Sequence, residues 1–379
     1  MPQPANNTSP AVSIVIPSWN GVNLLRRFLP SVIASARRYF ESSGSPVEIV
    51  IVNDGSEDDT SAFLIGEGFE IQSAGSKPGA GPEEGRPARV DLRLIINEAN
   101  LGFGKTVNRG FAAARHPLVF LLNNDVEVSL DAIAPLVENF SDQSVFAAHC
   151  RVFEVEDGAE VGTGKIGSFS RGFIRVHQSY VTGHSLEAAD QGSMSENPFY
   201  SIFATGGSSM FDRQKFLDLG SFDELLSPIY WEDVDISYRA WKHSFSIVYE
   251  PRSVVRHRVS STMRRVNKRK IWRLKQRNRL IYHWINLHDR RLFISHLFWV
   301  ALLAVTAPLR LQAGFILALL DAIKMLPAIR RRRREEMLAA KRSDRELFDS
   351  FERFSARADI IVYDDPLELE RLRSRPRRP

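Results

Sequence analysis

Three acidic residues at the expected start of a helix are best placed to do chemistry in this chain. Glu232, Asp233 and Asp235 lie in the segment YWEDVDISYRAWKH, residues 230–243. Apolar residues recur at helical spacing after them: Val234, Ile236, Tyr238 and Trp241. Because a helix N-terminus stabilises negative charge, at least one acid should stay ionised near neutral pH, as a general base must. The alternative is an acidic first turn with an Asp235–Arg239 ion pair.

The N-terminal third alternates β-branched runs with helical patterns. These predict strands at 12–17, 47–54, 92–97 and 117–125, helices at 24–40 and about 103–115, and a further helix that opens at Asp58. Such alternation predicts a doubly wound α/β sheet, whose ligands bind at the carboxyl ends of the strands. Polar residues cluster at those ends, at 18–20, 53–56, 97–100 and 123–125.

The glycine pattern excludes two common nucleotide-binding classes. No GxGxxG follows the first expected strand, and no GxxxxGK[ST] loop is present, so neither a dinucleotide enzyme nor a P-loop ATPase is expected. Gly102 and Gly104, in NLGFGKTVNRG (100–110), can bring backbone amides near a phosphate, and Lys105 adds positive charge. The alternative is a tight turn before a helix.

The order of motifs resembles family 2 of the glycosyltransferases. The motifs run from about residue 12 to residue 265 in the order of that family: IPSWN, VNDGSEDDT, NLGFGKTVNRG, LLNNDVEV, ATGGSSMFDR, GSFDE, YWEDVDISYRAW and VVRHRVSST. The resemblance implies a GT-A fold, a nucleotide-diphospho-sugar donor, a divalent cation and transfer with inversion at the anomeric carbon. Within the family, the chain looks most like bacterial rhamnosyltransferase-like members that build cell-surface glycans.

The resemblance also implies where the donor binds. Asp54 would hydrogen-bond the nucleobase or ribose, the segment 17–20 would wall the nucleoside, and the turn 100–105 would lie against the nucleotide. Gly206 and Gly207 would allow the backbone to approach the donor sugar; a strand kink is the alternative. The implied donor-binding residues are Pro17, Ser18, Asn20, Asp54, Asn100, Gly104, Lys105, Asn124 and Gly207.

The implied metal site has one clear anionic ligand. LLNNDVEV occupies the position of the family's DxD-type motif, but Asn123 and Asn124 precede Asp125. Asp125 and the donor pyrophosphate would hold Mg2+ or Mn2+ through oxygen atoms. His257 matches a further metal-site histidine of the family, and imidazole favours Mn2+. A strand-end histidine satisfied by the backbone is the alternative for His257.

The implied mechanism is a single displacement. Asp233 would deprotonate an acceptor hydroxyl, which attacks the sugar from the face opposite the leaving group through an oxocarbenium-like state. Glu232 would orient the acceptor or support the base. Trp231 offers an apolar face to the acceptor's sugar ring.

Length and composition predict one large catalytic domain with an appendage. The chain has 379 residues, of which 44% are apolar. We assign 1–11 to a flexible N-terminus and 12–265 to the catalytic domain, with a mobile Gly- and Pro-rich insertion at 72–90. The single cysteine, Cys150, allows no intramolecular disulfide, and no signal peptide is visible, which together favour the cytoplasm.

The composition changes after about residue 265. Residues 266–339 are expected to be basic and apolar helices, and 340–379 a charged tail with a disordered end. The apolar run 292–308 is barely long enough to cross a bilayer at about 1.5 Å per residue. Arginines on both sides favour two helices at 292–329 that lie in, or dip into, the inner leaflet of an anionic membrane. The alternative is a helical hairpin packed on the catalytic domain or in a dimer.

The expected function is sugar transfer to a glycan or lipid-linked acceptor in cell-surface polysaccharide synthesis. No nucleic-acid partner is expected, because the net charge is only +5 and the arginines lie beside apolar helices. A catalytically inactive sugar-nucleotide-binding or scaffold protein of the same fold is the alternative, favoured by the two asparagines before Asp125. Retention of Asp54, Asp125, Asp233 and His257 together argues against it.

Overall fold

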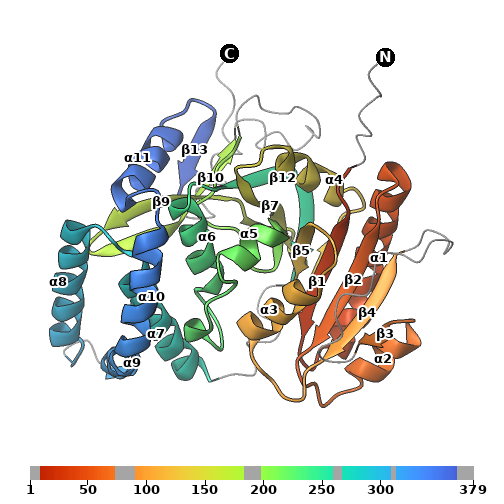
Figure 1. Ribbon diagram of the computed structural model, residues 1–379, viewed down its shortest axis with the longest axis horizontal. Helices are drawn as coiled ribbons and strands as arrows, with labels where there is room; N and C mark the ends of the chain where they lie inside the picture. The colour runs from red at the N-terminus through yellow and green to blue at the C-terminus, as the bar shows by residue number, and fades with distance from the viewer. Residues whose placement is uncertain (1–8, 73–89, 183–197, 259–266, 309–312, 365–379) are drawn as a thin grey trace.

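The computed structural model describes residues 9–72, 90–182, 198–258, 267–308 and 313–364 (Figure 1). Most of the predicted N-terminal segment, nearly all of the predicted insertion at 72–90 and the end of the predicted tail lie outside the described residues. Within them, a large mixed sheet carries helices on both faces, and a smaller sheet and a helical region follow.

The large sheet is mostly parallel in its N-terminal half. Its order is β3 (Glu70–Gln72), β4 (Asp91–Ile96), β2 (Val47–Asn53), β1 (Val12–Ser18), β5 (Leu118–Leu122), β11 (Ser208–Asp212), β7 (Val145–Glu154), β12 (Ser246–His257) and β6 (Val126–Val128), and β8 (Glu160–Gly162) pairs with β7. The strands from β3 to β5 in that order run parallel. β11 is antiparallel to both β5 and β7, and β12 is parallel to β7.

Helices cover both faces of this sheet, as a doubly wound fold requires. One face packs against α1 (Val22–Ser43), α2 (Thr60–Gly66) and α4 (Ile133–Glu138), and the other against α3 (Phe103–Ala113), α5 (Arg213–Asp218) and α6 (Glu232–Lys242). Alternate residues of β1 serve the two faces: Ile14 and Ile16 pack with Leu25 of α1, whereas Val15 packs with Val107 of α3. The doubly wound α/β prediction is confirmed.

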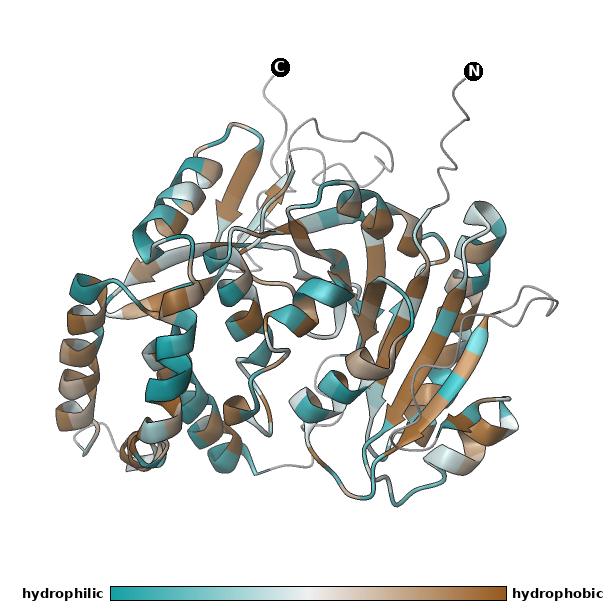
Figure 2. Cartoon of the chain, in the orientation of Figure 1, coloured by the Kyte–Doolittle hydropathy of each residue, from teal (hydrophilic) through white to brown (hydrophobic). Residues whose placement is uncertain are grey.

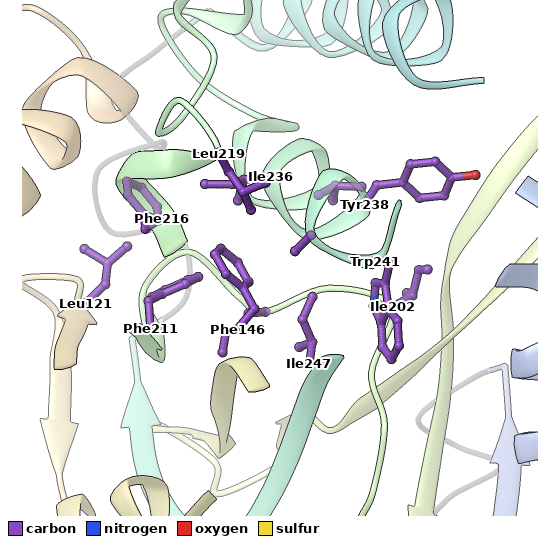
Figure 3. Close-up of a cluster of buried hydrophobic side chains, with 14 of the residues drawn as sticks. Leu121, Phe146, Ile202, Phe211, Phe216, Leu219, Ile236, Tyr238, Trp241 and Ile247 are labelled. Carbon is purple, nitrogen blue, oxygen red and sulfur yellow. The ribbon is translucent and has the colours of Figure 1, made fainter. Parts of the chain in front are cut away.

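The apolar face of α6 fixes the position of its acidic first turn. Ile236 and Trp241 are buried against Phe146 of β7 and Ile247 of β12 (Figure 3). The Trp241 indole Nε1 also donates to the Ser201 carbonyl at 3.1 Å. Because these side chains lie on the sheet-facing side at helical spacing, the helix cannot rotate without exposing them.

A smaller antiparallel sheet lies beside α6 and the C-terminal helices. Its order is β13 (Ile360–Tyr363), β10 (Phe173–Thr182) and β9 (Gly164–Ser170). The turn of the β9–β10 hairpin reaches the helices: Gly172 accepts a hydrogen bond from the His296 ring, and Ile174 donates one to His283 Nε2 at 2.9 Å. The hairpin is therefore tied to two helices that follow it by more than a hundred residues.

The C-terminal region is helical and packs on the rest of the chain. It contains α7 (Lys268–Asn286), α8 (Arg290–Thr306), α9 (Ala313–Lys324), α10 (Leu326–Ala339) and α11 (Asp344–Ser355). A core of α7, α8, α9 and α10 side chains encloses Phe173 of β10. No helix among the described residues combines the length and apolar character needed to cross a bilayer.

Two expectations for this region need correction. The segment 292–329 was expected to hold two helices, but it contains α8, α9 and the start of α10. Pro327 lies in the first turn of α10, where proline favours a new helix start. The segment expected only as a charged tail contains α11 and β13, and β13 pairs with β10. Buried Asp344, which begins α11, accepts hydrogen bonds from Tyr238 and Lys242 of α6.

Candidate active site

The parallel strands β1, β2 and β4 end together and open a cavity at their carboxyl ends. Their register aligns Ser18 with Asn53 and Asn53 with Ile96. Beyond those ends lies a cavity of ≈ 570 Å³. Its lining includes Trp19, Asn53, Gly55, Ser56, Asn97 and Asn100. Trp19 is 43% exposed, so its indole offers an apolar face to a planar ring at this edge.

Asp54 holds the loop that closes one side of this cavity. One carboxylate oxygen accepts from Asn97 Nδ2 at 2.7 Å and the Leu101 amide at 2.9 Å, and the other accepts from the Gly102 amide at 3.0 Å. Asp54 is only 4% exposed. Its side chain therefore anchors the loop 97–102, and its predicted contact with a nucleobase or ribose stays a prediction.

Hydrogen bonds to segments distant in the sequence hold the residues that were predicted to wall the nucleoside. Asn20 has a positive φ of 47°, its amide donates to Ser56 Oγ at 2.8 Å, and its Oδ1 accepts from the Glu57 amide at 2.8 Å. Ser18 Oγ accepts from Asn124 Nδ2 at 2.9 Å. The last contact joins the end of β1 to the segment that follows β5, so Ser18 and Asn124 lie together as the motif order implies.

The turn before α3 contains residues that were predicted to contact the nucleotide, and two of them, Asn100 and Lys105, line different cavities. Asn100 Oδ1 accepts from the Gly102 amide at 3.1 Å, and Asn100 lines the cavity next to Trp19. Lys105 instead forms a 3.3 Å ion pair with Glu224 and lines a second cavity of ≈ 480 Å³ beside α10. Gly102, with φ of 84°, provides the backbone shape that a residue with Cβ rarely adopts. Gly104 is buried near Phe222.

Asp125 and His257 meet at the far edge of the large sheet. β12 and β6 pair antiparallel with His257 opposite Val126, which brings His257 Nε2 to 3.0 Å from Asp125 Oδ1. The Asp125 carbonyl also accepts from the Arg258 amide at 3.0 Å. The sequence analysis placed these two residues in one site from motifs more than a hundred residues apart, and the structure brings them together.

The pair fits a divalent cation whose remaining ligands come from a phosphate group. One carboxylate and one imidazole are ligand types that Mn2+ accepts. Among the described residues, no group of three or more His, Cys, Asp or Glu side chains is arranged to hold a metal ion.

The three acids of α6 have three different environments. Asp235 is fully buried and forms a 2.8 Å ion pair with Arg239, so the structural alternative given for this turn is correct for Asp235. Asp233 accepts from the Gly206 amide at 3.2 Å and the Val234 amide at 2.8 Å, and burial raises its pKa.

Glu232 is the one of the three acids with an unpartnered oxygen among the described residues. Its Oε2 has no hydrogen-bond partner among the described residues, and the side chain is 8% exposed. Burial first, and then the nearby Asp233 carboxylate, raises the pKa of Glu232 to about 8. Because Glu232 and Asp233 are adjacent, a negative charge on one disfavours ionisation of the other. Such a pair can supply one protonated acid and one ionised base.

The Gly206–Gly207 turn connects the base candidate to the metal edge. The Gly206 amide contacts Asp233, and the Gly207 carbonyl accepts from the Asn123 amide at 3.0 Å. A Cβ on Gly207 would lie 2.4 Å from Asn123 Cγ, so only glycine fits there without displacing that side chain. The glycine pair thus allows the end of β5 and the start of α6 to approach one another.

Trp231 and its surroundings form the side of the site nearest the helical region. Its φ of 79° is rare for a residue with Cβ, and it turns the chain directly into α6. The indole ring packs on Tyr282 of α7 with a centroid distance of 5.2 Å. His177 of β10 lies on it edge-on at 6.5 Å.

His177 was not among the predicted site residues, because it belongs to none of the motifs named above. The alternation FIRVH at 173–177 was the available signal, since it predicts a strand with Arg175 and His177 on one face. In the structure Phe173, Ile174 and Val176 are buried and Arg175 and His177 are exposed.

The architecture is the GT-A fold. A crystal structure of GalNAc-T7 with UDP, GalNAc and Mn2+ matches this chain with a TM-score of 0.54 and 19% sequence identity, over 76% of this chain and 50% of that chain. This likeness concerns the fold.

The chain belongs to family 2 of the glycosyltransferases. The model described as "Glycosyltransferase like family 2" matches residues 82–282, which is more than half of the chain, and "Glycosyl transferase family 2" matches residues 13–67.

Two curated relatives illustrate how far the sequence likeness extends. An uncharacterized glycosyltransferase of Rickettsia typhi is 38% identical over 66 residues, which are 17% of this chain and 19% of that protein. A putative polypeptide N-acetylgalactosaminyltransferase 13 of Drosophila melanogaster is 25% identical over 255 residues, or 65% of this chain and 41% of that protein. The chain thus spans less than half the length of these relatives.

Proposed function

We propose that this protein is an inverting glycosyltransferase that moves a sugar from a nucleotide-diphospho-sugar to an acceptor hydroxyl. The observation that carries the proposal is the Gly206–Gly207 turn. It contacts Asp233 through one amide and the chain next to Asp125 through one carbonyl, so the base candidate and the metal-ligand pair flank one turn. A donor sugar bound there would have its phosphates on one side and the acceptor on the other.

Asp125 and His257 would hold the divalent cation, Mn2+ or Mg2+. When bound, the cation supplies Lewis-acid stabilisation of the negative charge on the leaving nucleoside diphosphate. The GalNAc-T7 structure, which contains Mn2+ with UDP, supports this assignment by its similar fold. The imidazole favours Mn2+ over Mg2+.

Asp233 takes the proton of the acceptor hydroxyl. As the acceptor oxygen bonds to the anomeric carbon, the bond from that carbon to the phosphate oxygen breaks and the hydroxyl proton moves to Asp233. The attack occurs opposite the leaving group, so the anomeric configuration inverts. The two backbone amides on the Asp233 carboxylate hold it in place and favour its ionised form.

Glu232 supports Asp233 by remaining protonated. With a pKa raised to about 8, Glu232 holds its proton at neutral pH and leaves the negative charge on Asp233. A protonated Glu232 also has a hydroxyl that can donate to an acceptor sugar. Trp231, half-buried against Tyr282, offers the apolar face on which that sugar packs.

We infer further that the sugar is a hexose and that the product is a cell-surface polysaccharide. The support for this finer assignment is the motif resemblance to rhamnosyltransferase-like proteins. The rival function, an inactive sugar-nucleotide-binding or scaffold protein, is favoured by the two asparagines before Asp125. The raised pKa of Glu232 argues against it, since a binding protein gains nothing from a buried acid with an unpartnered oxygen.

We propose that the protein acts in the cytoplasm, held to the inner face of the membrane by α8. Five large apolar side chains are exposed at helical spacing on this helix: Ile294, Leu297, Phe298, Leu302 and Val305. Figure 2 shows hydrophobic residues along most of α8, whereas the neighbouring α10 is largely hydrophilic. The exposed Arg290 and Arg291 begin the helix, where they can contact anionic headgroups.

Liposome cosedimentation tests the membrane proposal. Leu297→Ser/Phe298→Ser should release the protein from vesicles that contain an anionic phospholipid, because both side chains insert in the apolar layer. The control Ile65→Ser/Leu130→Ser removes two exposed apolar residues elsewhere and should leave binding unchanged. A full-length protein that ignores anionic vesicles would disprove this proposal and leave α8 as a candidate dimer interface.

Donor binding tests the enzymatic proposal. A panel of nucleotide sugars is screened by thermal shift with Mn2+ present, since a ligand at a hundred times its dissociation constant adds about 2.7 kcal/mol. At least one nucleotide sugar should raise the melting temperature, and its sugar-free nucleoside diphosphate should raise it as well. No shift with any member would contradict the proposed function.

A further inference from the structure

A group of five basic side chains includes His177, whose ring lies edge-on to the Trp231 ring. They come from both strands of the β9–β10 hairpin and from α7. The set, here named the basic cluster, is Lys165, Arg175, His177, Lys275 and Arg279. All four lysines and arginines act electrostatically on His177, whose ring lies 6.5 Å from the Trp231 ring.

Aromatic contacts hold the cluster against the turn that precedes α6. Lys275 Nζ lies 4.2 Å from the centre of the Tyr230 ring, and Arg279 Cζ lies 3.9 Å from the centre of the Phe173 ring. Tyr230 and Trp231 directly precede the acidic turn. Since consecutive Cα atoms are about 3.8 Å apart, the Trp231 Cα is at most about 7.6 Å from the Cα of Asp233. Two members of the basic cluster thus contact the two residues that directly precede the acidic turn, Lys275 on Tyr230 and His177 on Trp231.

The cluster has no acidic partner among the described residues. None of its members forms an ion pair there, whereas Arg239, Arg252 and Arg332 each contact a carboxylate. Among the residues that the structure describes, Lys165 Nζ donates only to Ser179 Oγ, at 2.6 Å.

Burial and neighbouring positive charge disfavour the charged forms of Lys165, His177 and Arg279. Burial lowers the pKa of Lys165 to about 8, and burial followed by the charge of Arg175 lowers the pKa of Arg279 to about 10. Like charges gathered without a counter-charge are unfavourable, and an anion placed among them would remove that cost.

We propose that the basic cluster binds a phosphate or diphosphate group carried by the acceptor. The inference rests on the proposed function, because it places the anion next to the hydroxyl that Asp233 deprotonates. Arginine and lysine are the side chains that bind phosphate oxygens, and Arg175 and Lys275 are exposed and so open to a ligand. The donor phosphates have their own place at Asp125 and His257, across the Gly206–Gly207 turn.

Two sources can supply this group. One is a lipid-linked acceptor, in which a prenyl diphosphate joins the glycan to the membrane. The other is a water-soluble glycan that carries phosphate. The shared chemistry is a phosphate ester near the acceptor hydroxyl, so inorganic pyrophosphate serves as the first probe.

Calorimetric titration with pyrophosphate tests the site itself. The solution contains a chelator, which prevents metal-dependent binding at Asp125 and His257. The full chain is compared with Arg175→Gln/Lys275→Gln, which removes two exposed cations, and with Arg37→Gln/Arg353→Gln, which removes two exposed cations from α1 and α11.

We expect pyrophosphate affinity to fall at least tenfold in the Arg175/Lys275 variant and to be unchanged in the Arg37/Arg353 control. An equal loss of pyrophosphate affinity in both variants would show that the affinity depends only on net charge, and would overturn the proposal. No measurable binding to the unmodified chain would overturn it as well.

Vesicles distinguish the two sources. Phosphatidylcholine vesicles with and without a long-chain prenyl diphosphate are added to the same three proteins. Binding that needs both the prenyl diphosphate and the Arg175/Lys275 pair identifies a lipid-linked acceptor, and pyrophosphate binding without vesicle binding identifies a soluble one. If nucleotide sugars still stabilise the protein but the two variants bind pyrophosphate equally, only this inference fails. If no nucleotide sugar binds, the proposed function fails too.

Discussion

The acid at the end of β2, Asp54, and the acids at the start of α6 differ in how fully their oxygens are hydrogen-bonded. Asp54 has three hydrogen-bond donors shared between its two oxygens, and they all come from the loop 97–102. Glu232 has an oxygen with no partner among the described residues, and Asp233 has only backbone donors. A satisfied carboxylate fixes a loop, whereas an unpartnered carboxylate oxygen can bond a substrate group.

The same contrast occurs within one turn of helix. Asp235, three residues after Glu232, is held by Arg239 and by Asn286 of α7 at 2.6 Å. Asp235 joins α6 to the C-terminal helices, and each of its carboxylate oxygens already accepts a hydrogen bond. The position of an acid in the motif therefore does not show whether its role is structural or chemical. The number and type of its hydrogen-bond partners does.

The largest expected effect is at Asp233. Asp233→Asn should lower turnover at least on the order of a hundredfold, the usual contribution of a positioned base, and leave donor binding intact. The control Asp349→Asn changes an exposed acid on α11 and should keep full turnover. Near-normal turnover in Asp233→Asn, measured by nucleoside diphosphate release, would move the base to Glu232.

The next effect is at the metal edge. Asp125→Ala should weaken both Mn2+ and donor binding by roughly tenfold or more, because loss of a direct ligand costs at least as much as loss of an outer partner. Calorimetry with Mn2+ and donor measures both affinities. Glu127→Gln, an exposed acid two residues away on β6, is the matched control. Full activity in excess chelator would show that the pyrophosphate is held without a metal.

Asp54→Ala tests whether the hydrogen bonds accepted by the Asp54 carboxylate have a structural role. It should lower the free energy of unfolding by about 1–3 kcal/mol, because the Leu101 amide loses its hydrogen bond and the buried Asn97 side chain loses its shorter one. Denaturant unfolding measures this loss, and the exposed Asp59, whose side chain makes no capping hydrogen bond, gives the control Asp59→Ala. Loss of donor affinity with unchanged stability would instead support the direct nucleoside contact that the resemblance implies.

The smallest effect is a change in the pH dependence of stability through Glu232. Its folded-state pKa of about 8 lies above its usual value of 4.5, so between these values the unfolded chain is ionised and the folded chain holds a proton. Stability therefore falls as pH rises through this window. Glu232→Gln should make the fall shallower in unfolding experiments from pH 5 to pH 8 (about the span of the shift). Equal slopes would show that Glu232 is not perturbed.

The sequence predicted those parts of the site that depend on local patterns. Strand-end residues such as Ser18 and Asn53, and the helix after Trp231, follow from periodicity and lie where expected. Asp125 and His257 were assigned to one metal site from the family order of motifs; the β6–β12 register brings their side chains into contact, and their role with a metal stays a prediction.

The remaining parts depend on contacts between distant segments. Lys105 forms an ion pair with Glu224, which lies over a hundred residues later in the chain, and its expected contact with the nucleotide stays a prediction. Arg175 and His177 were missed because their position depends on a hairpin held by α7 and α8. The tail segment 344–363 folds because buried Asp344 bonds to Tyr238 and β13 pairs with β10, and no local pattern shows either contact.

The most direct test of the central claim is nucleoside diphosphate release from a nucleotide sugar that stabilises the protein. The full-length chain with Mn2+ should release it, Asp233→Asn should release at least on the order of a hundredfold less, and a chelator should abolish release. Release from Asp233→Asn at the normal rate, or none from the unmodified chain with an acceptor extract present, would contradict the account of a glycosyltransferase with its base at the start of α6.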